Sequence, residues 1–228
     1  MKHPLSALRT FAASVCILGA FNAALSDELS NVTATEALQR LEQGNARFVA
    51  GRLSPTSPVG IAASRRKVAQ GQKPFAIIVG CSDSRVGPEV IFDQKVGDIF
   101  VIRTAGEIVD PVGLGSIEYA VAHLGSPLIV VLGQERCGAV AAAVAEAKEP
   151  GHIATVLKAI RPAVQETKGE PGDPVHNAVC AQAVDVTRQL QNAEPILKEA
   201  VQSGKLKIIA ALYNLDTGKV SLLPFSRK

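Results

Sequence analysis

Four short, mainly apolar segments are the feature of this sequence that most restricts its fold. Separated by amphipathic or small-residue segments, they occupy residues 75–80, 99–103, 127–132 and 206–212. A strand covered on one face alternates apolar and polar residues, whereas a strand covered on both faces is apolar throughout. Such segments alternating with helices predict an α/β domain with a mainly parallel central sheet flanked by helices. Residues 216–218 predict a turn into a last strand at 220–223, and hence an antiparallel edge hairpin.

The segments between these strands predict the flanking helices. Thr33 is a good N-cap, and Glu36 three residues later completes a capping box at the start of the first helix. Further helices are expected at residues 64–71, 115–124, 138–147 and, as two or three helices, within 152–203. No repeat or linker divides the chain after its N-terminal region, which predicts one domain over residues 27–228.

The first 26 residues have the pattern of a secretory signal peptide. A basic start with Lys2 and Arg9 precedes a mostly apolar or small stretch at residues 11–24. Residues 24–26, Ala-Leu-Ser, offer small side chains at the −3 and −1 positions of a cleavage site. We therefore expect residues 1–26 to be removed on export to a periplasm, which leaves no stable membrane insertion. A retained membrane anchor is the alternative, although the stretch is short for a bilayer core of about 30 Å.

Charge and aromatic content argue against a nucleic-acid partner. The full chain has a formal net charge of +3, and removal of the signal, which contains Lys2 and Arg9 but no acid, lowers it to +1. Trp is absent, and aromatic residues make up 4% of the chain. The mature protein therefore lacks both the basic excess that neutralises phosphates and the aromatic surfaces on which bases stack.

Cysteine usage indicates a metal site rather than a disulfide framework. Of the four cysteines, Cys16 lies in the predicted signal, and Cys81, Cys137 and Cys180 remain. An odd number in an oxidising compartment does not pair completely. Two thiols that hold a metal and one buried thiol account for the count.

Two of these cysteines follow predicted strands. Cys81 directly ends the first strand, and Cys137 comes shortly after the third. Open α/β sheets bind ligands at the carboxyl ends of strands, and two thiolates suit a borderline divalent ion, above all zinc. Asp83 lies where a loop could turn its carboxylate to the same ion, and Arg85 is spaced to pair with it through a bidentate fork. From spacing alone, inert buried cysteines and a loop ion pair are the competing interpretation.

Longer motifs surround these residues and occur in a fixed order. They are Cys-Ser-Asp-Ser-Arg-Val at 81–86, Gly-Asp-Ile-Phe-Val-Ile-Arg at 97–103, Gly-Ser-Ile-Glu-Tyr-Ala at 115–120 and Cys-Gly-Ala at 137–139. Together they resemble the β-class carbonic anhydrases. The sequences Gly-Asn-Ala-Arg-Phe at 44–48 and Gly-Gln-Lys-Pro at 71–74 agree with that family. The resemblance covers roughly residues 34–223, nearly all of the predicted mature chain.

The resemblance implies a zinc enzyme that interconverts carbon dioxide and bicarbonate. Cys81 and Cys137 would bind zinc as thiolates, and Asp83 would either bind the ion in a closed state or pair with Arg85 in an open one. The open state would leave a fourth position for water, and zinc-bound hydroxide would attack carbon dioxide. Gln72 matches a glutamine that hydrogen-bonds the substrate. A cleft at a homodimer interface would be lined by Phe100, Ala105 and Tyr119. Without the resemblance, Phe100 and Tyr119 would be ordinary core residues.

Two features depart from the family pattern. The family motif His-x-x-Cys contributes a histidine ligand, and here Gln134 stands at the histidine position before Cys137. An amide oxygen is a hard, weak donor for zinc. Four outcomes are therefore open: Gln134 binds the ion weakly, Glu135 takes its place although it is one residue out of register, Asp83 stays bound permanently, or metal affinity falls. Thr104 and Glu107 stand where the family commonly has asparagines, and Glu107 adds a potential charge near the cleft. Surface or boundary positions are expected for the histidines beyond the signal, His123, His152 and His176.

The sequence leaves several functions open. Zinc-dependent hydration of carbon dioxide is the leading hypothesis. The same fold and metal could act on another small electrophile, such as carbonyl sulfide or carbon disulfide, or could have lost turnover and only bind metal. Thiol redox chemistry between Cys81 and Cys137 is less favoured, because the sequence has no Cys-x-x-Cys motif.

Overall fold

A computed structural model describes residues 32–55, 66 and 68–224 of the chain. The predicted signal peptide at 1–26 lies outside these residues, as do residues 64, 65 and 67 of the predicted helix at 64–71. Within them, no helix combines the length and the apolar character needed to cross a membrane.

The centre of the fold is a five-stranded sheet in the order β2-β1-β3-β4-β5. Every residue of β1 and β3 is buried, as expected for strands enclosed between two layers of helices. The antiparallel partner β5 pairs only with the edge of β4, so the prediction of a parallel sheet with an edge hairpin is confirmed. The parallel strands are β1 (Ala76–Cys81), β2 (Ile99–Thr104), β3 (Leu128–Gln134) and β4 (Lys207–Tyr213), and the antiparallel strand is β5 (Val220–Leu222).

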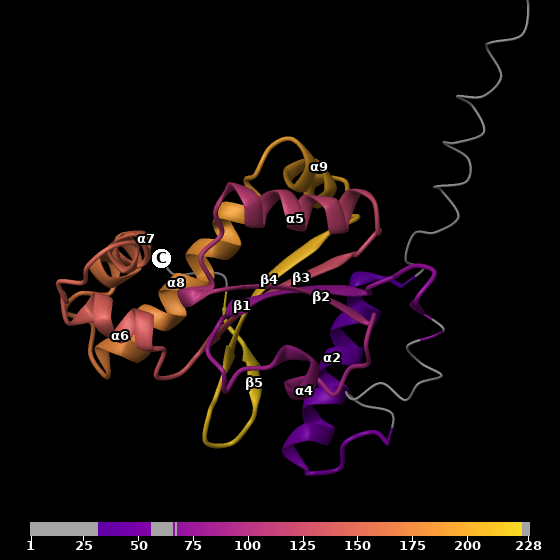
Figure 1. Cartoon of the computed structure of the whole chain (residues 1–228), viewed down its shortest axis with the longest axis horizontal. Helices are drawn as coiled ribbons and strands as arrows, with labels where there is room; N and C mark the ends of the chain where they lie inside the picture. Colours follow the sequence, from indigo (N-terminus) through magenta and orange to yellow (C-terminus); the bar gives the residue numbers. More distant parts are fainter. Residues whose placement is uncertain (1–31, 56–65, 67, 225–228) are drawn as a thin grey trace, which may run out of the picture.

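Helices cover both faces of this sheet, as Figure 1 shows. One face packs against α5 (Pro111–Ala122), α8 (Pro174–Gln191) and α9 (Ile196–Gln202), with Ile77 and Ile129 of the sheet in that core. The other face packs against α2 (Ala34–Val49) and α4 (Pro88–Ile91), with Ile78 and Val130 on that side. A third cluster contains residues of α6 (Gly138–Val144), α7 (Ile153–Glu166) and α8 together with Cys81 and Cys137. This third cluster places the two thiols at the carboxyl end of the sheet, packed against these helices.

Local chemistry sets where two of the helices begin. At α2 the predicted capping box is present, since the Thr33 hydroxyl accepts from the Glu36 N–H at 3.2 Å and the Glu36 carboxylate accepts from the Thr33 N–H at 2.8 Å. Helix α5 begins four residues earlier than predicted. Asp110 accepts from the N–H of Gly113 at 2.7 Å and Pro111 occupies the first turn, a start signal that also lies in the sequence.

The strand order creates one topological switch point. The chain passes from β1 to β2 on one side, and the next strand, β3, lies on the other side of β1. Ligands of open α/β sheets bind at such a point, beyond the carboxyl ends of the strands. Cys81 ends β1, and β3 runs two residues further than predicted because Gly133 and Gln134 continue the pairing with β4. Gln134 is therefore a strand residue, and Cys137 lies three residues beyond it.

Candidate metal centre and active site

Two free, buried thiols meet at the switch point. The sulfur atoms of Cys81 and Cys137 are 4.0 Å apart. The backbone N–H of Gly106 donates a hydrogen bond to the Cys81 sulfur at 3.3 Å. The pair is packed against apolar side chains such as Val140 and Ile160, so little water shields the two sulfurs from each other.

The two thiols bind protons as a coupled pair. A hydrogen bond from the Cys137 thiol lowers the pKa of Cys81, and the N–H of Gly106 and the side-chain amide of Gln134 lower it further, against the effect of burial. The same hydrogen bond to Cys81, followed by burial, raises the pKa of Cys137. One thiolate is therefore readily formed, whereas the second thiol keeps its proton.

The spacing of the sulfurs fits zinc. Zinc–sulfur bonds of about 2.3 Å at tetrahedral angles place two sulfurs about 3.8 Å apart, and the observed separation is 4.0 Å. Among the residues that the structure describes, no group of three His, Cys, Asp or Glu side chains is already gathered to hold a metal. The thiol pair alone therefore has the spacing expected of two zinc-bound sulfurs.

Asp83 is turned toward Arg85. The Arg85 Nε and Nη2 atoms donate to the two Asp83 carboxylate oxygens at 2.9 and 2.6 Å, and the Arg85 N–H donates to the same carboxylate at 2.9 Å. These contacts lower the pKa of Asp83 to about 2, chiefly through the Arg85 side chain. The bidentate pair predicted from spacing is present, and the carboxylate is ionised at neutral pH.

Arg103 holds the turn that carries Cys81 and Asp83. Its Nε donates to the Cys81 carbonyl oxygen at 2.8 Å and its Nη2 donates to the Asp83 carbonyl oxygen at 2.6 Å. Arg103 pairs in register with Gly80 on β1, which places the guanidinium beside the turn. In the sequence, Arg103 is only the last residue of the 97–103 motif. Its hydrogen bonds to backbone carbonyl groups could not be predicted, because every residue has such a group.

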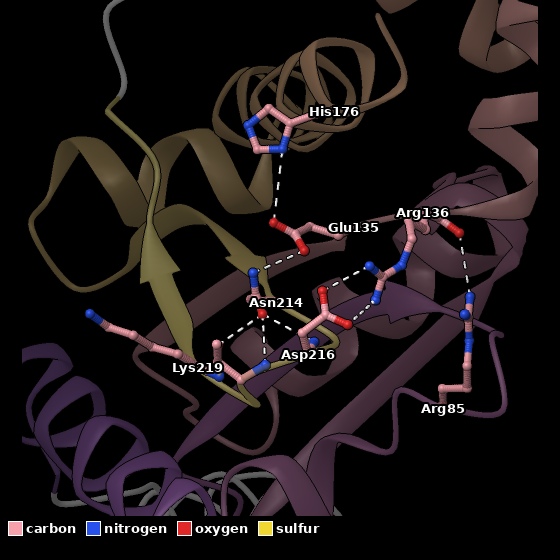
Figure 2. Close-up of polar contacts among 8 residues, drawn as sticks. Arg85, Glu135, Arg136, His176, Asn214, Asp216 and Lys219 are labelled. Carbon is pink, nitrogen blue, oxygen red and sulfur yellow. Dashed lines mark hydrogen bonds and ion pairs between the residues drawn. The ribbon is translucent and has the colours of Figure 1, made fainter. Parts of the chain in front are cut away.

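An outer set of polar contacts links Arg85 to the β4–β5 turn (Figure 2). Arg85 donates to the backbone oxygen of Arg136 at 3.3 Å, and Arg136 forms two hydrogen bonds of 2.8 Å with Asp216. Next to them, Asn214 donates to Glu135 at 2.9 Å. The turn between β3 and α6 is therefore tied to the edge hairpin through charged and polar side chains.

Two polar side chains near the thiols have no hydrogen-bond partner among the residues that the structure describes. Gln134 is 0% exposed and Glu107 is 1% exposed, and hydrogen bonds are absent from both of their side-chain groups within the described part of the chain. The Gln134 amide lies near enough to contribute to the lowered pKa values of Cys81 and Asp83. Burial, followed by the charge of Cys81, raises the pKa of Glu107 well above its usual range.

The remaining residues implied by the family resemblance are more exposed than the two thiols. Gln72 is exposed, and Ala105 is exposed at the start of the short 3-10 helix η2 (Ala105–Glu107). Phe100 is half-buried against the core of the α5 face. Tyr119 is 49% exposed, with its ring 5.1 Å from that of His123, so an ordinary core role for Tyr119 is wrong.

The other histidines and the third thiol lie where expected. His123, His152 and His176 are exposed, and the buried Cys180 sulfur lies 3.7 Å from a ring nitrogen of His176. The histidine missing at position 134 is thus not replaced by another imidazole from within the described ranges.

Comparisons with known proteins agree with this geometry. A family model described as carbonic anhydrase matches residues 76–220. Carbonic anhydrase 2 of Mycobacterium tuberculosis is 40% identical over 198 residues, which cover 85% of this chain and 95% of that protein. A carbonic anhydrase of Mycolicibacterium smegmatis is 37% identical with the same coverage. A tetrameric β-carbonic anhydrase from the fungus Sordaria macrospora superimposes with a TM-score of 0.65 at 25% identity, covering 90% of this chain and 97% of that one.

The parallel sheet, its edge hairpin and the flanking helices thus form a β-carbonic anhydrase fold. The chain belongs to the carbonic anhydrase family, in its β class. The prediction made from the motifs around Cys81 and Cys137 is confirmed.

Proposed function

We propose that this protein binds one zinc ion through Cys81 and Cys137 and hydrates carbon dioxide reversibly. The observation that carries the proposal is the buried thiol pair, 4.0 Å apart at the switch point, in a chain 40% identical to a carbonic anhydrase. A thiolate pair of this spacing suits a borderline divalent ion, and bound zinc supplies a nucleophile by lowering the pKa of water toward neutrality.

The residues around the thiol pair, termed the pocket, are Asp83, Arg85, Arg103, Glu107 and Gln134. Three of them have separate roles in this proposal. Arg85 holds the Asp83 carboxylate in its bidentate pair, which keeps a position beside the thiols available for water. Asp83 stays ionised, because its pKa is about 2, and can accept a hydrogen bond from that water. Arg103 fixes the backbone of the Cys81–Asp83 turn, so that these groups keep their relative positions.

We also infer a substrate cleft completed by a second copy of the chain, as a homodimer or a larger homo-oligomer. Tyr119, 49% exposed, and Val112, 78% exposed, lie on the outer side of α5, and large apolar surface of this kind is typical of a contact between protomers. Gln72, Phe100 and Ala105 are the proposed substrate contacts. Export to the periplasm, directed by residues 1–26, is proposed from their basic and apolar pattern.

The test is zinc content and carbon dioxide hydration of the purified mature protein, compared with two cysteine variants. Cys81→Ser should lose the zinc and the hydration measured by stopped flow. Cys180→Ser removes the buried thiol that is not in the pair, and should keep both. A Cys81→Ser variant that retained one zinc per chain would refute the site. If the purified wild type contained no zinc and had redox-active thiols, the proposal of zinc binding would be refuted. If it contained zinc but did not hydrate carbon dioxide, the proposed activity would be refuted.

A further inference from the structure

None of the roles proposed above accounts for the burial of the Glu107 side chain. It is 1% exposed, and within the described residues neither carboxylate oxygen has a hydrogen-bond partner. A buried carboxylate without a partner is strongly destabilising unless it is protonated or a cation lies beside it. Outside this pocket, the buried Asp93 is paired with Arg47, which is the usual arrangement. The isolation of Glu107 therefore indicates a ligand that the polypeptide itself does not supply.

The position of Glu107 connects it to the thiol pair. It closes η2, and the preceding residue, Gly106, donates its N–H to the Cys81 sulfur at 3.3 Å. The Gly106 carbonyl in turn accepts a hydrogen bond of 3.2 Å from Gln182 of α8, which anchors this turn. Glu107 interacts electrostatically with both Cys81 and Cys137. An ion between the two sulfurs would therefore attract this carboxylate, whose residue directly follows the Gly106 N–H that contacts Cys81.

We propose that Glu107 supplies the third protein ligand to the metal bound by Cys81 and Cys137, in place of the imidazole absent at position 134. This inference rests on the proposed zinc site. Carboxylate oxygen is a regular zinc ligand, whereas the neutral amide of Gln134 is a weak one. Three such donors are not yet gathered in the described residues, so the Glu107 side chain turns toward the thiols when the cation arrives.

An anionic third ligand has a consequence for the chemistry of the pocket. Two thiolates and an imidazole balance the double charge of zinc, whereas two thiolates and a carboxylate exceed it by one negative charge. The extra charge weakens the attraction between the metal and hydroxide, which raises the pKa of bound water. The pH at which the hydration rate rises should therefore be higher for the wild type than for a variant with histidine at position 134 and a neutral residue at 107.

The experiment measures zinc affinity by competition with a chromophoric chelator. Glu107→Gln, which keeps the shape and removes the charge, should weaken zinc binding by at least about tenfold. The double variant Glu107→Gln/Gln134→His should recover that loss, because an imidazole then takes the third position. Glu118→Gln, which changes a half-buried carboxylate of α5, is the matched control and should bind zinc as the wild type does.

Cobalt substitution and a second variant make the outcome independent of activity and of folding. The visible bands of the cobalt protein should shift between wild type and the double variant, since a carboxylate oxygen is exchanged for a nitrogen. Gln134→Ala should keep zinc affinity within about threefold, well short of the loss typical of a supporting ligand group. Unfolding of each variant in its zinc-free form checks that it folds.

The outcomes separate this inference from the proposed function. Wild-type affinity in Glu107→Gln, or a large loss in Gln134→Ala without one in Glu107→Gln, would overturn the role of Glu107 and leave the thiol site intact. A wild type that bound no zinc at all would overturn the proposed function itself.

Discussion

Replacing Arg85 with glutamine should release Asp83 from its present position. The two side-chain hydrogen bonds, at 2.9 and 2.6 Å, are the main cause of the low pKa of Asp83. The difference between the usual 3.8 and about 2 corresponds to about 2 kcal/mol of favourable interaction with the carboxylate. Because the Arg85 side chain is 52% exposed, solvent screening reduces this to about 1 kcal/mol.

The sign of the effect follows from the direction of the shift. A lowered pKa means that the pair stabilises the fold above the usual pKa of 3.8, and that this stabilisation is lost as pH falls toward 2. At neutral pH Asp83 is ionised with or without Arg85. In Arg85→Gln the freed carboxylate can therefore compete for a metal at the thiols, and about 1 kcal/mol corresponds to about a fivefold gain in zinc affinity.

The assay is an NMR titration of the Asp83 carboxyl carbon in zinc-free protein, followed by zinc competition and stopped-flow hydration. In Arg85→Gln the pKa of Asp83 should rise toward 3.8, zinc should bind more tightly, and hydration should slow because Asp83 occupies the water position. Arg136→Gln is the control, since it breaks only the outer pair with Asp216. If Asp83 still titrates near 2 in Arg85→Gln, or if Arg136→Gln shifts it equally, the pair does not control this carboxylate.

Three further substitutions test the framework around the site. Gly44→Ala should destabilise the protein by about 3 kcal/mol or more in urea unfolding, because a Cβ there would lie 1.8 Å from the backbone oxygen of Phe92. Gly115→Ala, with open space around it, should instead stabilise by up to about 1 kcal/mol, and equal effects would contradict the packing argument. Arg103→Lys should cost about 1–2 kcal/mol and weaken zinc binding, since an ammonium cannot hold both carbonyls of the 81–83 turn. An unchanged free energy of unfolding and an unchanged zinc affinity would show that the 81–83 turn keeps its conformation without Arg103.

Much of the architecture could be predicted from local sequence. The apolar segments at residues 75–80 and 127–132 correspond to β1 and β3, whose residues are all buried. The capping box at Thr33 is present as predicted. These features were predictable because a doubly covered strand and a helix start each need particular residues over a short stretch. The length of β3 was not, because its last two residues are strand only through pairing with β4, more than 70 residues away.

The candidate site, like the fold, could be predicted only in part from the sequence. Cys81, Asp83, Arg85 and Cys137 were identified from motifs, and the structure places the two thiols together and pairs the two charged residues. Their separation of 4.0 Å depends on the adjacency of β1 and β3, which is set by strand order. That order comes from the packing of the whole sheet and not from any one segment.

The sequence alone determined the fold class, the family and the identity of the thiol pair, because these depend on residue types at fixed positions along the chain. Tertiary structure decided which side chains lie buried without partners. From the sequence, Gln134 was interpreted as a weak zinc ligand and Glu107 as an additional charge near the cleft. Folding encloses both beside the thiols with no hydrogen-bond partner among the described residues, because burial depends on strands and helices that meet only when the chain is folded.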